Sequence, residues 1–295
     1  MRLRTLPLSL SGTVMGVCIA YTITDSPAPG TWLIALTTAL LQILSNLSNE
    51  LGDTLSGTDT AERQGMHYSL QDGGMSIGEM KGLIAGIAAC CCASGLGMVW
   101  TAFGTILAPA PLALLLLGAA AIWAAMHYTL GKNPYGYRGL GDVFVFVFFG
   151  LVSCCGACFV AAHSVGLATV LKASALPACA IGFFSIGVLN VNNIRDAATD
   201  AATRVTVAIL LGERRARIYQ TVLLALGWVL MCVFSLVKAA GASAWRWIYL
   251  VTLPLYVLHL KGVWTHSGRA LDHLLPMLVI STFVLSVLAG LGIML

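Results

Sequence analysis

Nine stretches of about 20 predominantly apolar residues follow one another along the chain, and they restrict its fold more than any other feature. A stretch of this length crosses the hydrocarbon core of a bilayer as an α-helix, because a single helix satisfies its own backbone hydrogen bonds in lipid. With 58% hydrophobic and only 9% charged residues, the composition is typical of a polytopic membrane protein. The predicted spans are residues 5–24, 31–50, 79–101, 109–129, 143–162, 170–191, 216–237, 246–264 and 274–294. We therefore expect one all-α transmembrane domain, residues 1–295, with nine helices bundled around a central cavity.

The charged residues predict how this bundle lies in the membrane. Nine spans place the two termini on opposite sides. Of the 16 Lys and Arg residues, only Lys172, Lys238 and Arg246 fall on the side of the short connections, and positive charge marks the cytoplasmic side. The N-terminus is therefore expected in the cytoplasm and the C-terminus outside. Of the 12 Asp and Glu residues only Asp25 lies outside, and because this rule does not govern acids, their clustering calls for a functional reason.

Two other features exclude common classes of site. The net charge of +4 comes from basic residues scattered among loops, so we expect no nucleic-acid partner. The nine cysteines lie inside apolar stretches, where they are expected to act as small packing residues. Cys154-Cys155-x-x-Cys158 has the spacing of a metal motif but lacks a second ligand pair, so it is not interpreted as one.

Two polar segments, residues 46–59 and 192–200, interrupt the apolar chain with regularly spaced oxygen ligands. If the segments are helical, spacings of three, four and seven or eight residues place these side chains on one face of each helix. The residues concerned are Asn46, Asn49, Glu50 and Asp53 in the first segment and Asn192, Asp196 and Asp200 in the second. Two oxygen-rich helix faces at the ends of apolar helices predict a site for Mg²⁺, which binds one or two carboxylates, water and substrate phosphate.

Cations accompany these acids on the same side of the membrane. They are Arg63, Lys81, Lys132, Arg138, Arg195 and Arg204. Carboxylates that hold Mg²⁺, together with Arg or Lys, form the usual site for a phosphate. At the mouth of an apolar bundle, such a site suits an amphiphile with a charged head and a long hydrocarbon tail, such as a polyprenyl diphosphate.

The loop at 128–142 adds Tyr128 and Lys132, four residues apart, among glycines that allow close approach of the backbone to a ligand. A glycine-rich turn at the membrane surface, with interfacial tyrosines, would account equally well for this loop taken alone.

Together, the segment at 46–59, the Tyr-x-x-x-Lys at 128–132 and the Asn-Asn-x-Arg-Asp-x-x-x-Asp at 192–200 resemble the three loop motifs of the UbiA superfamily of intramembrane aromatic prenyltransferases. The nine-helix count agrees with that superfamily. Three finer features are similar to its menaquinone-pathway branch, which prenylates 1,4-dihydroxy-2-naphthoate. They are Arg4-Thr-Leu-Pro7-Leu-Ser-Leu-Ser-Gly12, Gly-Asp53 followed by Gly57-Thr-Asp59, and Gly131-Lys132 through Gly141-Asp142 leading into Phe144-Val-Phe-Val-Phe-Phe-Gly150.

The resemblance implies an electrophilic aromatic substitution in a bacterial cytoplasmic (inner) membrane. Diphosphate leaves with the help of Mg²⁺, the prenyl cation is attacked by the dihydroxynaphthoate ring, CO₂ is lost, and demethylmenaquinone remains. It also implies roles for the motif residues. Metal ligands would be Asn49, Asp53, Asp59, Asn192, Asp196 and Asp200, with Asn46 and Glu50 as secondary candidates; Arg63, Lys132 and Arg195 would bind diphosphate, Tyr128 would lie near the reacting carbon, and Asp142 would orient the acceptor.

The sequence departs from the family pattern in the first motif, where Glu50 follows Asn49 and Gly57 takes the last acidic place. Asp59 is expected to replace that acid, with Glu50 as the alternative. Arg204 stands where relatives often carry Lys, which keeps the charge but changes its geometry. Another acceptor, such as 4-hydroxybenzoate or homogentisate, is the first alternative function. A membrane transporter is the second, although a transporter would place ionisable residues at mid-bilayer.

Overall fold

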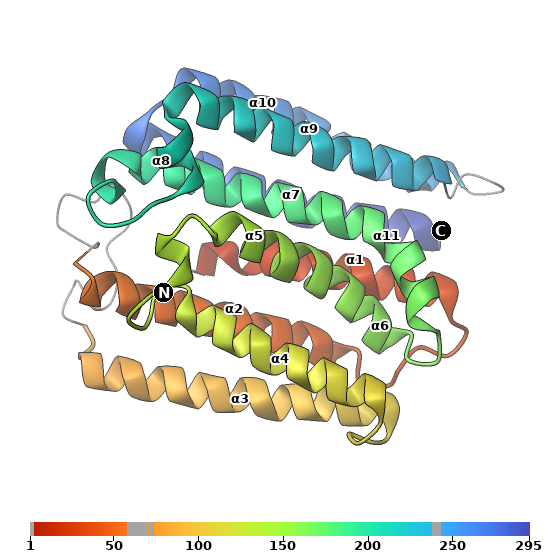
Figure 1. Cartoon of the computed structure of the whole chain (residues 1–295). Coiled ribbons are helices and arrows are strands. Elements are labelled where there is room, and N and C mark those ends of the chain that lie inside the picture. Colours follow the sequence, from red (N-terminus) through yellow and green to blue (C-terminus); the bar gives the residue numbers. More distant parts are fainter. Residues whose placement is uncertain (1–2, 58–69, 71–73, 238–242) are drawn as a thin grey trace.

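The computed structural model describes residues 3–57, 70, 74–237 and 243–295, which form helices and connecting turns. Figure 1 shows the long helices lying side by side, with the two termini toward opposite ends of the bundle. The long helices are α1 (Leu6–Ile23), α2 (Trp32–Leu55), α3 (Ile77–Phe103), α4 (Pro109–His127), α7 (Leu167–Asp200), α9 (Glu213–Val237), α10 (Leu253–Thr265) and α11 (Leu274–Met294). The shorter elements are η1 (Leu3–Thr5), η2 (Tyr135–Tyr137), α5 (Gly141–Val145), η3 (Phe146–Gly156), α6 (Ala157–Ala161), α8 (Val207–Leu211), η4 (Ala244–Thr252) and η5 (Gly268–Leu271).

In the described part of the chain, eight helical segments are long and apolar enough to cross a membrane. They are α1, α3, α4, α7 and α9, together with the continuous segments formed by α5, η3 and α6, by η4 and α10, and by η5 and α11. They coincide with eight of the nine predicted spans. The remaining predicted span, 31–50, is α2, a 24-residue helix that is not among the eight. Several of its polar residues, among them Gln42 and Asn46, are buried inside the protein.

Local sequence signals fix several helix ends. Ser76 and Glu79 form a reciprocal capping box at the start of α3, so two otherwise unpaired backbone donors are satisfied. Pro7 and Pro109 lie in the first turns of α1 and α4, where a missing N–H costs no hydrogen bond. The regularly spaced oxygen ligands of both acidic segments lie on helices, because α2 continues to Leu55 and α7 continues through residues 192–200.

The helices pack around α1, which contacts α2, η3, α7 and α11. One group consists of α2, α3 and α4, whose buried contacts include Leu44, Leu51, Met80 and Ile84. The larger core joins α1, η3, α7, α9 and α11. Large apolar side chains such as Trp100 and Leu116 stay exposed on α3 and α4, as expected for a face that contacts lipid.

The helix formed by α5, η3 and α6 has an unusual middle. Residues Phe146–Gly156 form a π-helix, whose i→i+5 hydrogen bonds make a wider turn than that of an α-helix. This segment packs against α7 and α1, and it buries Cys154 and Cys155 in the core. The cysteines here are therefore packing residues, as the sequence predicts.

Candidate functional site

A cavity of about 400 Å³ lies between the two groups of helices. Its wall includes both Ile34 and Asp53 of α2, whose separation along the helix corresponds to about 28 Å at 1.5 Å per residue. Apolar side chains form most of its length, among them Leu41, Met98, Leu114, Leu117, Phe148, Phe149, Val152, Val160 and Val279. Polar side chains gather where α2 and α7 end, and they include Arg4, Thr5, Asn46, Asn49, Asp53, Tyr128, Asn192, Arg195, Arg204 and Asp272. One end of the cavity is thus lined by charged side chains, and the rest of its wall is mainly apolar.

On the α2 side, Asp53 is held by the loop that follows α4. The Tyr137 hydroxyl donates to Oδ1 of Asp53 at 2.9 Å, and the Asp53 side chain is almost completely buried. Thr129 donates to Oδ1 of Asn49 at 3.2 Å and to the Ser48 carbonyl at 2.9 Å. A Cβ at Gly52 would lie 2.4 Å from the Thr129 hydroxyl, so only glycine allows the loop to approach α2 this closely.

On the α7 side, Arg195 organises the second acidic segment. Its Nε and Nη2 donate to the two carboxylate oxygens of Asp196 at 2.8 and 2.7 Å, and Nη2 also donates to Asn192 at 2.8 Å. Its Nη1 donates to Asp272 at 2.6 Å, and Asp272 also pairs with Arg4 at 3.0 Å. This forked geometry fixes the position of the guanidinium group as well as neutralising charge.

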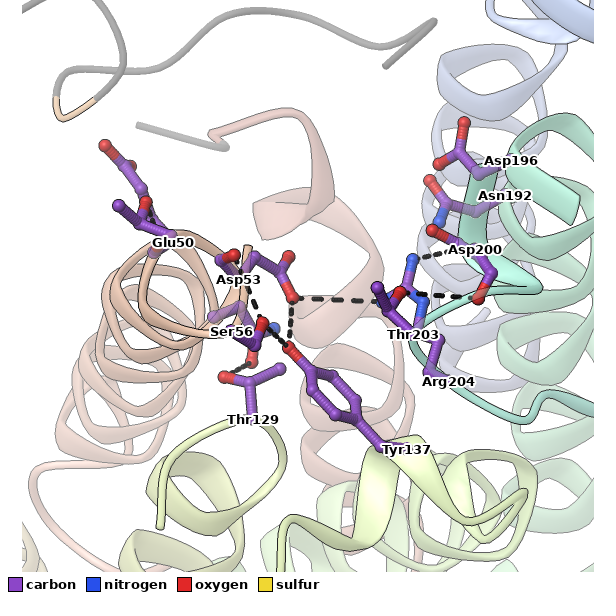
Figure 2. A network of polar contacts seen from close by, with 12 residues as sticks. Glu50, Asp53, Ser56, Thr129, Tyr137, Asn192, Asp196, Asp200, Thr203 and Arg204 are labelled. Carbon is purple, nitrogen blue, oxygen red and sulfur yellow. Dashed lines mark hydrogen bonds and ion pairs between the residues drawn. The ribbon is translucent and has the colours of Figure 1, made fainter. Parts of the chain in front are cut away.

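Arg204 joins the two sides. Its guanidinium lies between Asp200, to which it donates a hydrogen bond, and Asp53, whose Oδ1 is 3.9 Å from Nη1 (Figure 2). Burial alone would lower the pKa of Arg204, but the charges of Asp200 and Asp53 outweigh it and raise the pKa above its ordinary value. Arg204 therefore stays positively charged between the two acidic segments.

Aromatic rings form the cavity wall beside this charged end. Tyr135 stacks on Phe144 with ring centroids 3.8 Å apart, and it meets Tyr128 edge-on at 5.4 Å. Burial, and secondarily the nearby Tyr128, raises the pKa of Tyr135, so its hydroxyl stays protonated. Tyr128, Tyr135, Phe144 and Phe148 all line the cavity, and their faces can attract a cation.

The donor chemistry at this end fits Mg²⁺, because carboxylate and amide oxygens are its preferred protein ligands. Asn49, Asp53 and Asn192 line the cavity. Asp200 is not part of the cavity wall, but it forms an ion pair with Arg204, which is. Within the described ranges, however, no three acidic, His or Cys side chains come together as a metal-binding group. The positive charge between the two segments is instead that of Arg204.

The remaining predicted site residues lie in different places. Glu50 is buried but points away from Arg204, and it accepts a hydrogen bond from the Leu70 backbone at 3.2 Å (Figure 2). Lys132 is exposed and lies outside the cavity wall. Asp142 accepts from Tyr219 at 2.9 Å.

Asp142 lines a second, small pocket together with Tyr128 and Asn193. Asn46 lines the main cavity and accepts a hydrogen bond from Gln42 at 2.9 Å. The predicted residues Asp59 and Arg63 lie outside the described part of the chain.

Four residues at the charged end were not among the predicted site residues: Arg4, Tyr137, Arg204 and Asp272. Arg4 and Tyr137 belong to motif segments, and Arg204 is one of the cations near the second acidic segment. The sequence around these three residues therefore indicates that they lie near the site. No motif includes Asp272, which lies between η5 and α11, far along the chain from both acidic segments.

Comparison with known proteins identifies the family. The pattern of the UbiA prenyltransferase family matches residues 9–291. A 1,4-dihydroxy-2-naphthoate octaprenyltransferase of Escherichia coli is 37% identical over 89% of this chain and 83% of its own length. An enzyme of the same name from Haemophilus influenzae is 33% identical over 99% of this chain and 94% of its own.

Among solved structures, the apo form of a UbiA homolog from Aeropyrum pernix superposes with a TM-score of 0.74, covering 100% of this chain and 98% of that one at 19% identity. This likeness shows that the helical fold is shared. The match of the family pattern to nearly the whole chain shows more: this protein belongs to the UbiA prenyltransferase family.

Proposed function

We propose that this protein transfers a polyprenyl group from polyprenyl diphosphate to 1,4-dihydroxy-2-naphthoate, with loss of CO₂, in menaquinone biosynthesis. One observation carries the proposal: a single cavity about 28 Å long joins a charged end, built from two acidic segments and arginines, to a mainly apolar channel. That combination matches a diphosphate head and a hydrocarbon tail. The names of the relatives support the choice of acceptor.

The charged end would bind and stabilise the leaving diphosphate. Arg195 and Arg204 line the cavity and offer guanidinium donors, whose planar geometry suits phosphate oxygens. Asn49, Asp53, Asp59, Asn192, Asp196 and Asp200 would hold Mg²⁺. When bound, Mg²⁺ supplies further neutralisation of the negative charge that develops on the leaving group.

The aromatic wall would stabilise the carbon that diphosphate leaves behind. As the allylic C–O bond breaks, its electron pair departs with diphosphate and the prenyl group becomes cationic. The ring faces of Tyr128, Tyr135 and Phe144 attract positive charge. The apolar channel excludes water, which would otherwise quench the cation.

The acceptor ring then forms the new C–C bond with the prenyl cation, and its carboxylate leaves as CO₂. Electron balance makes the immediate product the naphthalenediol, which is the reduced form of demethylmenaquinone. Asp142 would act indirectly, by positioning Tyr128, because Asp142 lines a small pocket with Tyr128 and Asn193, which both also line the main cavity.

We also propose that α2 spans the bilayer as the ninth helix, with the N-terminus in the cytoplasm of a bacterium and the charged end of the cavity facing it. Its 24 residues correspond to about 36 Å of helix, longer than the hydrocarbon core of about 30 Å. The position of the termini toward opposite ends of the bundle agrees with an odd number of crossings (Figure 1).

The test is product formation in nanodiscs with dihydroxynaphthoate, a polyprenyl diphosphate and Mg²⁺. The wild type should give prenylated product and CO₂, and EDTA should abolish both. Asp53→Asn and Asp196→Asn should each lower kcat by about 10²–10³-fold, as the loss of one group that stabilises developing charge does. Asp25→Asn is the matched control, because this exposed carboxylate lies before α2, at the other end of the bundle from Asp53.

Each outcome has a distinct meaning. Undiminished activity in Asp53→Asn and Asp196→Asn, or in EDTA, would refute the proposed site. Product with 4-hydroxybenzoate or homogentisate but not with dihydroxynaphthoate would keep the reaction class and change the acceptor. Transmembrane flux of substrate without product would indicate a transporter.

A further inference from the structure

The guanidinium of Arg204 occupies the space between the two acidic segments. Its side chain is only 7% exposed, and the side chains of Asp53 and Asp200 are each 1% exposed. Buried carboxylates require a compensating positive charge, and here one arginine supplies it to an aspartate from each segment. Figure 2 shows Asp53 on α2 and Asp200 on α7 facing each other across this guanidinium.

The residues around Arg204 hold its backbone in place, but they leave its Nε without a hydrogen bond. The backbone N–H groups of Val205 and Gly139 donate to Tyr137 and Val205 at 3.0 and 2.9 Å, which ties the segment after α7 to the loop after α4. Buried Nε of Arg204 finds no hydrogen-bond partner among the residues that the structure describes. A buried donor without an acceptor, on a group that lines the cavity, marks a place for an acceptor from a ligand.

We propose that Arg204 is an exchangeable counter-ion. With the cavity empty, its guanidinium takes the place between Asp53 and Asp200; when a divalent cation arrives together with diphosphate, the guanidinium turns onto the diphosphate oxygens and yields that place to the metal. The inference rests on the proposed function, and it adds a residue that couples the binding of the two ligands.

The coupling follows from electrostatics. A guanidinium and a divalent cation repel each other, so both cannot lie between the same two carboxylates in a buried site. When metal binds without diphosphate, the guanidinium of Arg204 must leave its carboxylate partners with no diphosphate oxygens to replace them. This cost weakens the binding of metal alone. Diphosphate offers Arg204 new acceptors and removes that penalty. Each ligand therefore increases the affinity of the site for the other by the same factor.

The experiment titrates the full-length protein in nanodiscs with Mn²⁺, detected by electron paramagnetic resonance, with and without inorganic diphosphate. In the wild type, saturating diphosphate should lower the Kd of Mn²⁺ by at least about tenfold, within the usual range of coupling between sites. In Arg204→Gln, Mn²⁺ alone should bind at least about tenfold more tightly than in the wild type, and diphosphate should lower its Kd by a smaller factor than in the wild type, because only the direct attraction between metal and diphosphate remains.

Two further variants separate this role from a purely structural salt bridge. Arg204→Lys keeps the charge, so it should restore weak binding of Mn²⁺ alone and its coupling to diphosphate. Arg215→Gln is the matched control, since Arg215 is an exposed arginine at the start of α9 and is not among the cations expected at the site. Its Mn²⁺ titrations should match those of the wild type.

Equal Kd values for Mn²⁺ alone in the wild type and Arg204→Gln would overturn the inference while leaving the proposed function intact. If Arg204→Gln folds poorly without metal, Mn²⁺ must restore its thermal stability, because it supplies the missing positive charge; failure to do so also contradicts the inference. A wild type that binds neither Mn²⁺ nor diphosphate, and forms no product, would refute the proposed function itself.

Discussion

Single residues at the charged end act mainly through contacts made from other parts of the chain. Asp53 belongs to the motif that the sequence identifies, but Tyr137 and Arg204, which contact it, come from two separate loops. Asp272 likewise completes the set of carboxylates around Arg195. Tyr137 lies 84 positions along the chain from Asp53, and Asp272 lies 77 positions from Arg195, so local sequence does not reveal either contact.

Tyr137→Phe tests the residue scale. It removes the hydroxyl that donates to Asp53 at 2.9 Å and contacts Ser56 at 2.9 Å, but keeps the ring. A hydrogen bond to a charged group contributes about 1.5–3 kcal/mol, so kcat/KM should fall by about tenfold or more. Steady-state kinetics with varied Mg²⁺ measure this. Tyr21→Phe, at an exposed position near the end of α1, is the control, and wild-type kcat/KM in Tyr137→Phe would contradict the assigned role.

At the scale of whole elements, the shape of the cavity wall depends on how closely neighbouring helices and loops approach one another. The π-helical η3 places Phe148, Phe149, Val152, Ser153 and Gly156 in the cavity wall, at a spacing of four residues that a wide helical turn favours. The loop after α4 reaches α2 only because Gly52 has no side chain. Both features position the site without contributing a reactive group.

Gly52→Ala tests the closeness of that approach. The new Cβ would lie 2.4 Å from the Thr129 hydroxyl, and overpacking of this kind typically costs about 1–3 kcal/mol of stability. We expect a lower thermal midpoint in detergent and reduced activity, since Thr129 also orients Asn49. Gly82→Ala on α3 is the matched control, because its Cβ meets open space and alanine favours helix by about 1 kcal/mol. Equal midpoints for the two variants would disprove this packing argument.

For the whole molecule, the important feature is the cavity between two groups of helices. Its length of about 28 Å, from Asp53 at the charged end to Ile34, approaches the thickness of the hydrocarbon core. The helices that form it also expose apolar side chains to lipid, which gives one structure both a dry interior and a membrane-embedded exterior.

Gly118→Leu tests the depth of the tail channel. Gly118 lines the cavity about 15 Å along α4 from Tyr128, and a Cβ there meets nothing within 4 Å. A leucine should fill the channel, lowering kcat/KM for a long polyprenyl diphosphate while sparing geranyl diphosphate. Gly86→Leu on the exposed face of α3 should change neither. Competition between the two donors measures the ratio, and an unchanged ratio in Gly118→Leu would argue against the tail lying here.

The sequence by itself determined the helical membrane architecture and the two acidic helix faces, because both depend on local periodicity: apolar runs of bilayer length, and oxygen ligands spaced by turns of a helix. It also identified the family, through motifs that are contiguous in the chain. Only the tertiary structure decided that Arg204 and Tyr137 contact Asp53, that Lys132 stays exposed while Asp272 enters the site, and that residues 146–156 form a π-helix. These features depend on side chains from distant segments meeting in space, and on packing between helices, neither of which leaves a periodic signal in the sequence.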